Sequence, residues 1–403
     1  MIPSKPMKDN KKILGIERNI FYIGLCSFLT DTTTKMIYAV MPLFLLSLGA
    51  TKTELSLIEG IAESTASTIK ALSGWWSDKI RKNKPFMVVG YAFTAFLSPL
   101  FAFVTSPMQV LLIRFTERIG KGIRTAPRDS LICASAEKGR SGRSFGFHKT
   151  MDNSGAIIGP LLAGLILLLF PKNYRMVFLF ALIPGTFGLM TLLKFVKEAK
   201  TTCEKPMGKF AFKDFPKKYY FFLVIIFIFT MGNSTDALLL VKASDIGIAS
   251  VFIPMIYLLF NSVSVLFAIP AGILSDRIGR ERLIIFGYLL YSLLYFGFGR
   301  TNSQLMVVLL FAMYGLYSAA TDGIQKALVS DMTPTNKKGT GLGIYNCLVG
   351  MTLLPASVIA GLLYDHVNNQ APFYYGAILA LTATILMFIF YRKGRGRKVI
   401  NCD

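Results

Sequence analysis

The chain contains twelve long apolar segments, and this feature constrains its fold more than any other. A helix needs about 20 consecutive, mostly apolar residues to cross the hydrocarbon core of a bilayer. Segments of this kind lie near residues 19–46, 54–77, 85–106, 108–126, 144–169, 175–194, 219–241, 250–275, 282–300, 303–330, 340–363 and 372–391. Backbone polar groups must be paired inside lipid, so each segment is expected to be a helix. The sequence therefore predicts an all-α membrane protein with twelve transmembrane helices.

The composition of the chain agrees with a membrane location. Hydrophobic residues make up 53% and charged residues 16% of the chain, whereas soluble domains average about 25% charged residues. The formal net charge is +22, but the basic residues lie mostly in short loops between apolar segments, which is typical of an orientation signal. We expect membrane lipids and no nucleic acid as partners, and a monomer. The five cysteines show no paired or metal-like spacing, and we expect neither a metal nor a cofactor.

Two similar charged loops indicate that the chain is built from two related halves. "GWWSDKIRKNK" covers residues 74–84 and "GILSDRIGRER" covers residues 272–282. They lie about half the chain apart, and a repeat of this kind is typical of a duplicated architecture. The longest hydrophilic stretch, 195–218, separates six apolar segments from six. We therefore predict an N-terminal six-helix half (1–194), a cytoplasmic linker (195–218) and a C-terminal six-helix half (219–403).

The distribution of lysine and arginine predicts the orientation of the helices. With twelve spans, both termini and alternate loops share one side of the membrane. The few basic residues at the opposite side are Lys52, Lys172, Arg175, Lys242 and Arg300. Positive residues accumulate on the cytoplasmic side, so we expect both termini and the linker to be cytoplasmic and the protein to lie in the cytoplasmic membrane. No small-residue cleavage site follows the basic N-terminal segment, so we expect the first helix to be retained.

The repeated loop resembles a motif of the major facilitator superfamily of secondary transporters, G-x-L-A-D-R-x-G-R-[KR]. The second copy matches it at Gly272, Leu274, Asp276, Arg277, Gly279 and Arg280, and the first copy keeps Gly74, Asp78, Lys79 and Lys82. A second resemblance is to the family's fifth-helix motif, which is associated with antiporters. It is carried by Gly146, Gly155, Gly159, Pro160 and Gly164. More loosely, Arg118 and Gly122 resemble a motif of the fourth helix.

The resemblance implies two pseudo-symmetric six-helix bundles that work by alternating access. By the same resemblance, the charged loops latch the cytoplasmic ends of the two halves in the outward-facing state. The gating residues would be Gly74, Asp78, Gly272, Asp276, Arg277 and Arg280. An aspartate in such a loop can cap a neighbouring helix N-terminus. In the fifth helix, Gly155 and Gly159 are four residues apart, a spacing that allows close helix packing, and Pro160 would bend the helix.

Charged residues inside the apolar segments point to the transport pathway. The basic ones are Lys35, Lys70, Arg114, Arg118, Lys121, Lys149 and Lys326, and the acidic ones are Asp31, Glu59, Glu63, Glu117, Asp152, Asp236 and Asp322. Each would cost at least about 2.5–3.5 kcal/mol if it faced lipid at the bilayer centre, so we expect them to point inward and to pair. Only Asp236, Asp322 and Lys326 lie in the second half, so the halves share a plan but differ in chemistry.

Helical periodicity groups these charges into stripes. Glu59, Glu63 and Lys70 share one face of the second span, and the fourth span has a comparable stripe. Secondary transporters bind solutes near the midplane of the membrane, where Glu63 is expected to lie. Desolvation raises the pKa of a carboxyl group and a nearby cation lowers it, which allows solute and proton to compete. The predicted proton-coupling residues are Glu63, then Asp31, with Glu59 and Asp152.

The predicted solute-binding residues come from both halves. The basic candidates are Arg118, Lys70, Lys35, Arg114 and Lys121, and those of the second half are Asn233, Asp236, Tyr314, Tyr317, Thr321 and Gln325. The other interpretation is that the charges are structural ion pairs that join helices and that the aromatic stripe is ordinary helix packing.

The favoured function is a proton-coupled secondary transporter for a small polar organic solute, with anionic solutes that bear carboxylates as one option. The alternative is a drug–proton antiporter, which the fifth-helix motif favours but the charged interior does not. A membrane-embedded enzyme or receptor is a third class. The chain contains no HExxH, GxSxG or phosphate-loop pattern, so we expect no enzyme. The sequence leaves import or export, and symport or antiport, open.

Overall fold

The structure, a computed structural model, describes residues 12–13, 15–80, 82–136, 141–198, 215–233, 235–333 and 338–395, without the side chains of 71–72, 74–80, 141–143, 338–340 and 394–395. Its first half contains the short strands β1 (Lys12–Ile13) and β2 (Ile16–Glu17), the helices α1 (Arg18–Ser47), α2 (Lys52–Ile80) and α3 (Lys84–Leu97), the 3₁₀ helix η1 (Ser98–Phe103), and α4 (Pro107–Ser135), α5 (Ser141–Leu169) and α6 (Tyr174–Phe195). Its second half contains α7 (Lys217–Gly232), α8 (Asp236–Asp245), α9 (Ile253–Ile278), α10 (Arg280–Arg300), α11 (Gln304–Met332), α12 (Lys338–His366) and α13 (Ala371–Arg395). The predicted all-α membrane fold is confirmed.

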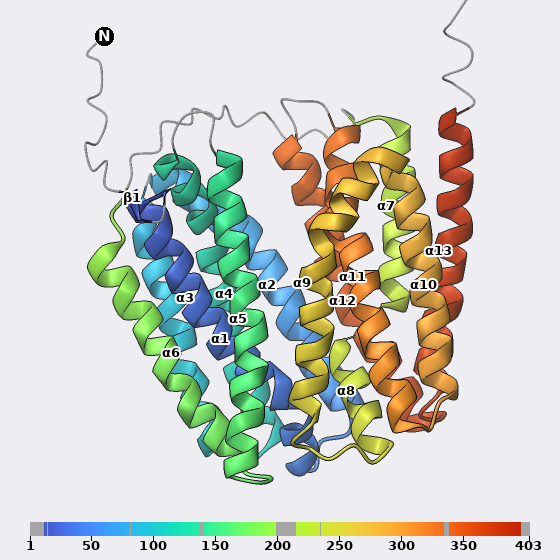
Figure 1. Ribbon diagram of the computed structural model, residues 1–403, viewed down its shortest axis with the longest axis horizontal. Helices are drawn as coiled ribbons and strands as arrows, with labels where there is room; N and C mark the ends of the chain where they lie inside the picture. The colour runs from blue at the N-terminus through green and yellow to red at the C-terminus, as the bar shows by residue number, and fades with distance from the viewer. Residues whose placement is uncertain are drawn as a thin grey trace, which may run out of the picture.

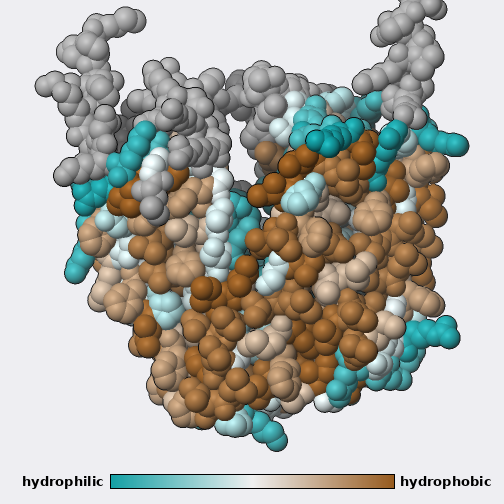
Figure 2. All heavy atoms as spheres, in the orientation of Figure 1, coloured by the Kyte–Doolittle hydropathy of each residue, from teal (hydrophilic) through white to brown (hydrophobic). Residues whose placement is uncertain are grey.

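Each predicted span corresponds to one helix or one pair of consecutive helices. Within the described residues, nine segments are long and apolar enough to cross a membrane, and α3 with η1 and α7 with α8 each count as one. The helices α1, α2 and α4 are not among the nine, and they carry most of the charges noted in the sequence. Figure 2 shows a broad apolar band across this face of the molecule, with hydrophilic side chains gathered above and below it. This band is what a bilayer would surround.

The helices form two bundles that lie side by side (Figure 1). In the N-terminal bundle, α1 packs on α5 and α6, and α4 packs on α2 and α3. In the C-terminal bundle, α9 packs on α11, and α13 packs on α7 and α10. The two bundles meet mainly where α2 packs on α12 and α5 packs on α9. The linker predicted at 195–218 falls largely on residues 199–214, outside the described part of the chain, and stays a prediction.

The bundles are joined on the side of the molecule away from the ends of the chain. We call the side where α1 begins and α13 ends the terminal side, and the opposite one the far side (Figure 1). On the far side, the Asp365 carboxylate accepts backbone N–H hydrogen bonds from Lys52 at 3.3 Å and Thr53 at 2.7 Å. Midway along α2, the Ser64 hydroxyl donates to the Gly350 carbonyl oxygen at 2.6 Å. On the terminal side, Figure 2 shows a notch between the bundles with hydrophilic side chains in it.

The seventh predicted span is interrupted, whereas the apolar pattern favoured one helix over 219–241. Helix α7 ends at Gly232, and α8 begins at Asp236. The Thr235 side chain accepts a hydrogen bond from the Ala237 backbone N–H at 3.3 Å and so caps α8. A short polar segment followed by a threonine cap is a helix-start signal, which the hydrophobicity of the flanks obscured. The break places the N-terminus of α8 inside the membrane region.

The small residues of α5 pack against α1. A Cβ atom at Gly155 would lie 2.6 Å from the Phe28 carbonyl oxygen, and one at Gly159 would lie 2.7 Å from the Thr32 carbonyl oxygen. Larger residues there would push the helices apart. Gly164 lies against Met255 of the other bundle, and Pro160 lies within α5. Gly146 has no described atom within 4 Å of where its Cβ would be.

Candidate transport site

Glu63 and Arg118 form an ion pair across α2 and α4 near the middle of both helices. Arg118 Nη2 lies 2.9 Å from Glu63 Oε1. The arginine side chain is 6% exposed and the glutamate side chain is 39% exposed. Arg118 Nε is buried and has no hydrogen-bond partner among the described residues. One partner thus faces open space, and the guanidinium retains an unused donor for which a fork-shaped anion is the matching ligand.

One turn closer to the far side, Glu59 and Arg114 form a second pair that is closed to solvent. Arg114 donates two hydrogen bonds to the Glu59 carboxylate, from Nε at 3.1 Å and from Nη2 at 3.0 Å. Its Nη1 donates to Glu117 Oε2 at 3.1 Å. All three side chains are at most 2% exposed. The sequence prediction assigned Glu59 to proton transfer and Arg114 to the solute, but this geometry favours a structural role in holding α2 against α4.

Lys35 connects the two bundles. Its ammonium group donates a hydrogen bond to the Tyr257 hydroxyl on α9 at 2.9 Å. It also lies over the rings of Tyr38 and Tyr257, at 5.7 and 5.2 Å from their centroids, an arrangement that stabilises a cation. No carboxylate of the described residues lies within salt-bridge distance of Lys35. Lys35, which was predicted to bind the solute, therefore forms a contact between α1 and α9 in this structure.

Asp152 belongs to a polar network within the N-terminal bundle. Its carboxylate lies 3.6 Å from His148 Nε2 and 3.8 Å from Arg128 Nη1. His148 Nε2 in turn lies 2.8 Å from the hydroxyl oxygen of Ser27. Asp31 is close enough to Asp152 to interact electrostatically, but forms no ion pair within the described residues. Asp31 and Asp152, two of the predicted proton carriers, thus lie near each other, in a region shared by α1, α4 and α5.

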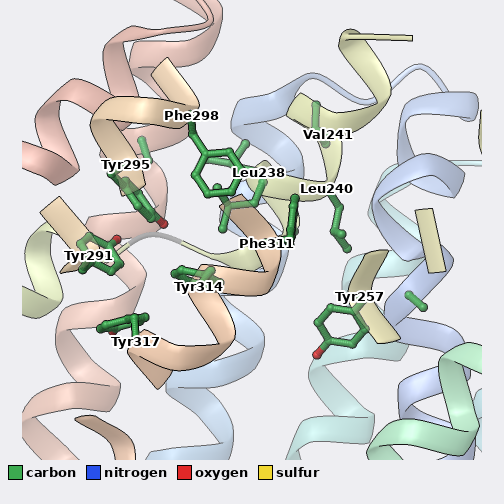
Figure 3. Close-up of a cluster of buried hydrophobic side chains, with 14 of the residues drawn as sticks. Leu238, Leu240, Val241, Tyr257, Tyr291, Tyr295, Phe298, Phe311, Tyr314 and Tyr317 are labelled. Carbon is green, nitrogen blue, oxygen red and sulfur yellow. The ribbon is translucent and has the colours of Figure 1, made fainter. Parts of the chain in front are cut away.

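The C-terminal bundle contains a cluster of tyrosines, to which Tyr291, Tyr314 and Tyr317 belong (Figure 3). The Tyr314 hydroxyl donates to Asp236 Oδ1 at 2.9 Å, at the N-terminus of α8. The Tyr291 hydroxyl donates to the Gly232 carbonyl oxygen at 3.0 Å and approaches Asn233 Oδ1 at 3.3 Å. These contacts hold the break between α7 and α8 against α10 and α11.

The remaining predicted ligands of this bundle are engaged inside it. The Tyr314 and Tyr317 rings stack with their centroids 5.2 Å apart, and both side chains are buried. The Thr321 hydroxyl donates to the Tyr317 carbonyl oxygen at 2.9 Å. The buried Gln325 amide approaches the Tyr288 hydroxyl at 3.2 Å and accepts from Tyr345 at 2.7 Å. In this conformation Asp236 and Asn233, which are half-buried, are the more accessible members of the predicted set.

Four lysines of the charged set have no ion-pair partner among the described residues. Lys70 and Lys121 are half-buried, and Lys149 and Lys326 are exposed. Within the described part of the chain, none of the four has a carboxylate within 4.0 Å. Lys121 is close enough to Arg118 to interact electrostatically, so it extends the basic stripe predicted on α4. In the same described residues, no group of three or more potential ligand side chains could hold a metal ion.

The second charged loop joins helices within the C-terminal bundle. Arg280 Nε donates to Asp331 Oδ2 at 2.7 Å, and its Nη2 lies 3.8 Å from Asp276 Oδ1. Gly279, between α9 and α10, has φ = 100°, a backbone conformation that favours glycine. At Gly272, no described atom lies within 4 Å of the position that a Cβ would take. Arg277 is exposed.

The first charged loop is described only in part: residue 81 and the side chains of 74–80 lie outside the described residues, whereas the side chains of 82–84 are described. Both predicted gating residues of this copy, Gly74 and Asp78, fall within 74–80. Asp276 is 71% exposed, and the bundles are apart on this side. A latch between the halves is therefore a prediction for the conformation in which the terminal side is closed.

Several residues of the site were not predicted from the sequence. Tyr257 lies one turn before Asn261 on α9, whose amide donates to the Tyr257 carbonyl oxygen at 2.7 Å, but nothing in the sequence marks the tyrosine as a partner of Lys35. Arg124 is buried, donates to Thr94 Oγ1 at 2.7 Å and lies over the Tyr91 ring at 4.5 Å from its centroid. Arg124 lies at the end of the predicted fourth span, where a basic side chain is expected to face water. Its four-residue spacing from Arg128 was the available signal.

Comparison with known proteins decides the family. The family model of the Major Facilitator Superfamily matches residues 23–241 and 221–401. The chain belongs to the major facilitator superfamily. It is 34% identical over 387 residues to an uncharacterized MFS-type transporter of Methanocaldococcus jannaschii, covering 94% of this chain and 96% of that one. The protein is thus a membrane transporter and not an enzyme.

One further relative and one solved structure extend this comparison. The chain is 26% identical over 326 residues to the multi-drug resistance efflux pump PmrA of Streptococcus pneumoniae, covering 76% of this chain and 79% of that one. A solved structure of a POT family transporter in complex with 5-aminolevulinic acid superimposes with a TM-score of 0.80, covering 95% of this chain and 98% of that one. At 13% identity, this second likeness concerns the fold alone.

Proposed function

We propose that this transporter moves a small organic anion across the cytoplasmic membrane by alternating access, and that Glu63 and Arg118 couple this movement to protons. The observation that carries the proposal is the single contact of 2.9 Å between an accessible glutamate and a buried arginine with an unused donor. A bound carboxylate would compete with Glu63 for the guanidinium. A carboxylate that loses its cation away from water takes up a proton, so solute binding and protonation are linked.

The experiment for this proposal is transport into proteoliposomes under an imposed pH gradient. Radiolabelled mono-, di- and tricarboxylates are screened in both directions, with a gradient of either sign. We expect at least one carboxylate to accumulate against its own gradient, and its accumulation to disappear when a protonophore removes the pH gradient. Carboxylate transport that is insensitive to the pH gradient would exclude the coupling.

Efflux of lipophilic compounds is the second candidate, favoured by the likeness to the pump named above and by the tyrosine cluster of the C-terminal bundle. Aromatic side chains suit lipophilic cations, but the charged interior of the N-terminal bundle does not. Tetraphenylphosphonium is a suitable probe in the same proteoliposomes. Proton-driven movement of this cation, without movement of any carboxylate, would favour drug efflux instead.

The proposed orientation places both termini in the cytoplasm, so that this structure is open to the cytoplasm. It rests on the scarcity of lysine and arginine on the far side. A variant that retains Cys203, in the predicted linker, as its one cysteine should react with an impermeant maleimide in inverted vesicles and not in intact cells. Labelling in intact cells would reverse the orientation.

Asp276 is expected to stabilise the state in which the terminal side is closed, by capping a helix of the other half. Asp276→Asn should then increase the share of molecules that are open to the terminal side by about twofold to fivefold, since a negative charge at a helix N-terminus contributes about 0.3–1 kcal/mol. Spin-label distances between the terminal-side ends of α4 and α11 measure this share, with Asp331→Asn as a variant that removes only the contact within the bundle. Equal shares in Asp276→Asn and the parent would exclude the latch.

A further inference from the structure

Three lysines lie in the terminal-side halves of helices from both bundles. Lys70 comes from α2, Lys149 from α5 and Lys326 from α11. They are about six to ten residues from the terminal-side ends of their helices, which corresponds to about 9–15 Å along a helix. We call them the mouth lysines. They lie deeper than the loops, where charged side chains point to water-filled space or to partners.

The mouth lysines interact across the gap between the bundles. Lys70 and Lys326 are close enough to repel each other electrostatically. Lys149 and Lys326 both interact with Asp322 on α11. On α2, Lys70 lies beyond Ser67, which is in contact with Gly350 of α12. Lys70 therefore lies next to the contact between α2 and α12, on the side of that contact nearer to the notch.

The carboxylates near the mouth lysines offset their charge only in part. Asp129 interacts with Lys70, but the same carboxylate lies 3.0 Å from Arg128. Asp322 accepts a hydrogen bond from Ser318 at 2.8 Å. Within the described residues, no mouth lysine has a carboxylate within 4.0 Å. Among the described residues, the three lysines and Arg128 thus outnumber Asp129 and Asp322, and on α4 the buried Nε of Arg118 has no partner.

We propose that Lys70, Lys149 and Lys326 form an anion-binding site at the mouth, which takes a solute with two or more negative charges. Closure of the terminal side brings α2 and α5 toward α11 and compresses three like charges. Repulsion between them opposes closure until an anion lies among them. The site thus captures the solute before Arg118 does and couples closure to its presence. The class of solute rests on the proposed function, whereas the effect of the lysines on closure does not.

The test measures closure of the mouth without a proton gradient and without knowledge of the natural solute. Spin labels on the terminal-side ends of α4 and α11 report the closed share at constant pH. In the double variant Lys70→Gln and Lys326→Gln, the closed share relative to the open one should rise about threefold to tenfold without any added anion. Lys172→Gln, at the far side, is the matched control, and Lys70→Arg with Lys326→Arg should behave like the parent.

Sulfate serves as the probe for the anion. In the parent, sulfate should increase the closed share more than chloride at equal ionic strength, and this difference should be absent in the double Gln variant. An unchanged closed share in the double variant, or equal effects of sulfate and chloride in the parent, would overturn the proposal. Neither result depends on Glu63, so failure here is distinguishable from failure of the proton coupling.

Discussion

Replacement of Arg114 by leucine is expected to lower the free energy of unfolding by about 3–5 kcal/mol. Arg114 is fully buried and donates to Glu59 and Glu117, whose side chains are 2% exposed. Without the guanidinium, two carboxylates would remain close together in a region without water. Removal of one partner from a buried ion pair is far more costly than removal of the whole pair, because the remaining charge is uncompensated.

The matched variants separate charge from packing. Arg300→Leu, which removes an exposed arginine at the end of α10, should change the free energy of unfolding by less than about 0.5 kcal/mol. Combining Arg114→Leu with Glu59→Gln and Glu117→Gln should recover a large part of the lost stability. Unfolding in mixed micelles of rising SDS content, followed by circular dichroism, measures these differences. A loss below about 1 kcal/mol in Arg114→Leu would show that the triad does not join α2 to α4.

The fold was predictable because its physical cause is local. Each span needs enough apolar residues to cross a bilayer, and the backbone of each span must satisfy its own hydrogen bonds. Both requirements are visible in the sequence without knowledge of neighbouring helices. The ends of the helices were less predictable: α4 continues to Ser135, beyond the predicted end at 126. The backbone hydrogen bonds of a helix continue where its side chains have already become polar.

The sequence predicted which charged residues share a helix face, but not which of them form ion pairs. Periodicity places Glu59 and Glu63 on one face of α2, and Arg114 and Arg118 on one face of α4. In the structure these residues form two ion pairs one helical turn apart, of which the pair of Glu59 and Arg114 is buried and the pair of Glu63 and Arg118 is partly exposed. Whether an ion pair is shielded from water depends on the neighbouring helices that cover it. The sequence of a single helix does not show which helices these are. For the same reason the contact between Lys35 and Tyr257 was not predicted.

Glu63→Gln is expected to abolish proton-driven accumulation and to retain solute binding. For one proton moved per solute, a gradient of one pH unit supports at most about tenfold accumulation. In Glu63→Gln the ratio of inside to outside solute should fall to about one, because glutamine cannot carry a proton. Counterflow at equal pH on both sides should continue, since the Arg118 guanidinium remains to bind the anion.

Glu54→Gln is the matched control for this variant. Glu54 lies on the same helix, exposed at its far-side end, where it accepts a hydrogen bond from the Thr51 backbone N–H at 2.8 Å. The same change of charge and shape should leave accumulation at the parental level. Asp31→Asn identifies the second candidate, which lies near Lys121 and Asp152. Parental accumulation in both Glu63→Gln and Asp31→Asn would move the coupling site to Asp152 or Asp236.

Arg118→Ala should produce the complementary defect. It removes the group that the solute and Glu63 share, so the apparent affinity for the solute should fall about tenfold to a hundredfold, the range expected when a hydrogen bond to a charged group is lost. The measurement is the concentration dependence of counterflow, in which the proton gradient has no part. Weakened binding in Arg118→Ala together with intact binding but lost accumulation in Glu63→Gln would separate the two partners of one ion pair. If Arg118→Ala binds the solute like the parent, the anion is held elsewhere and the competition for Arg118 cannot be the coupling step.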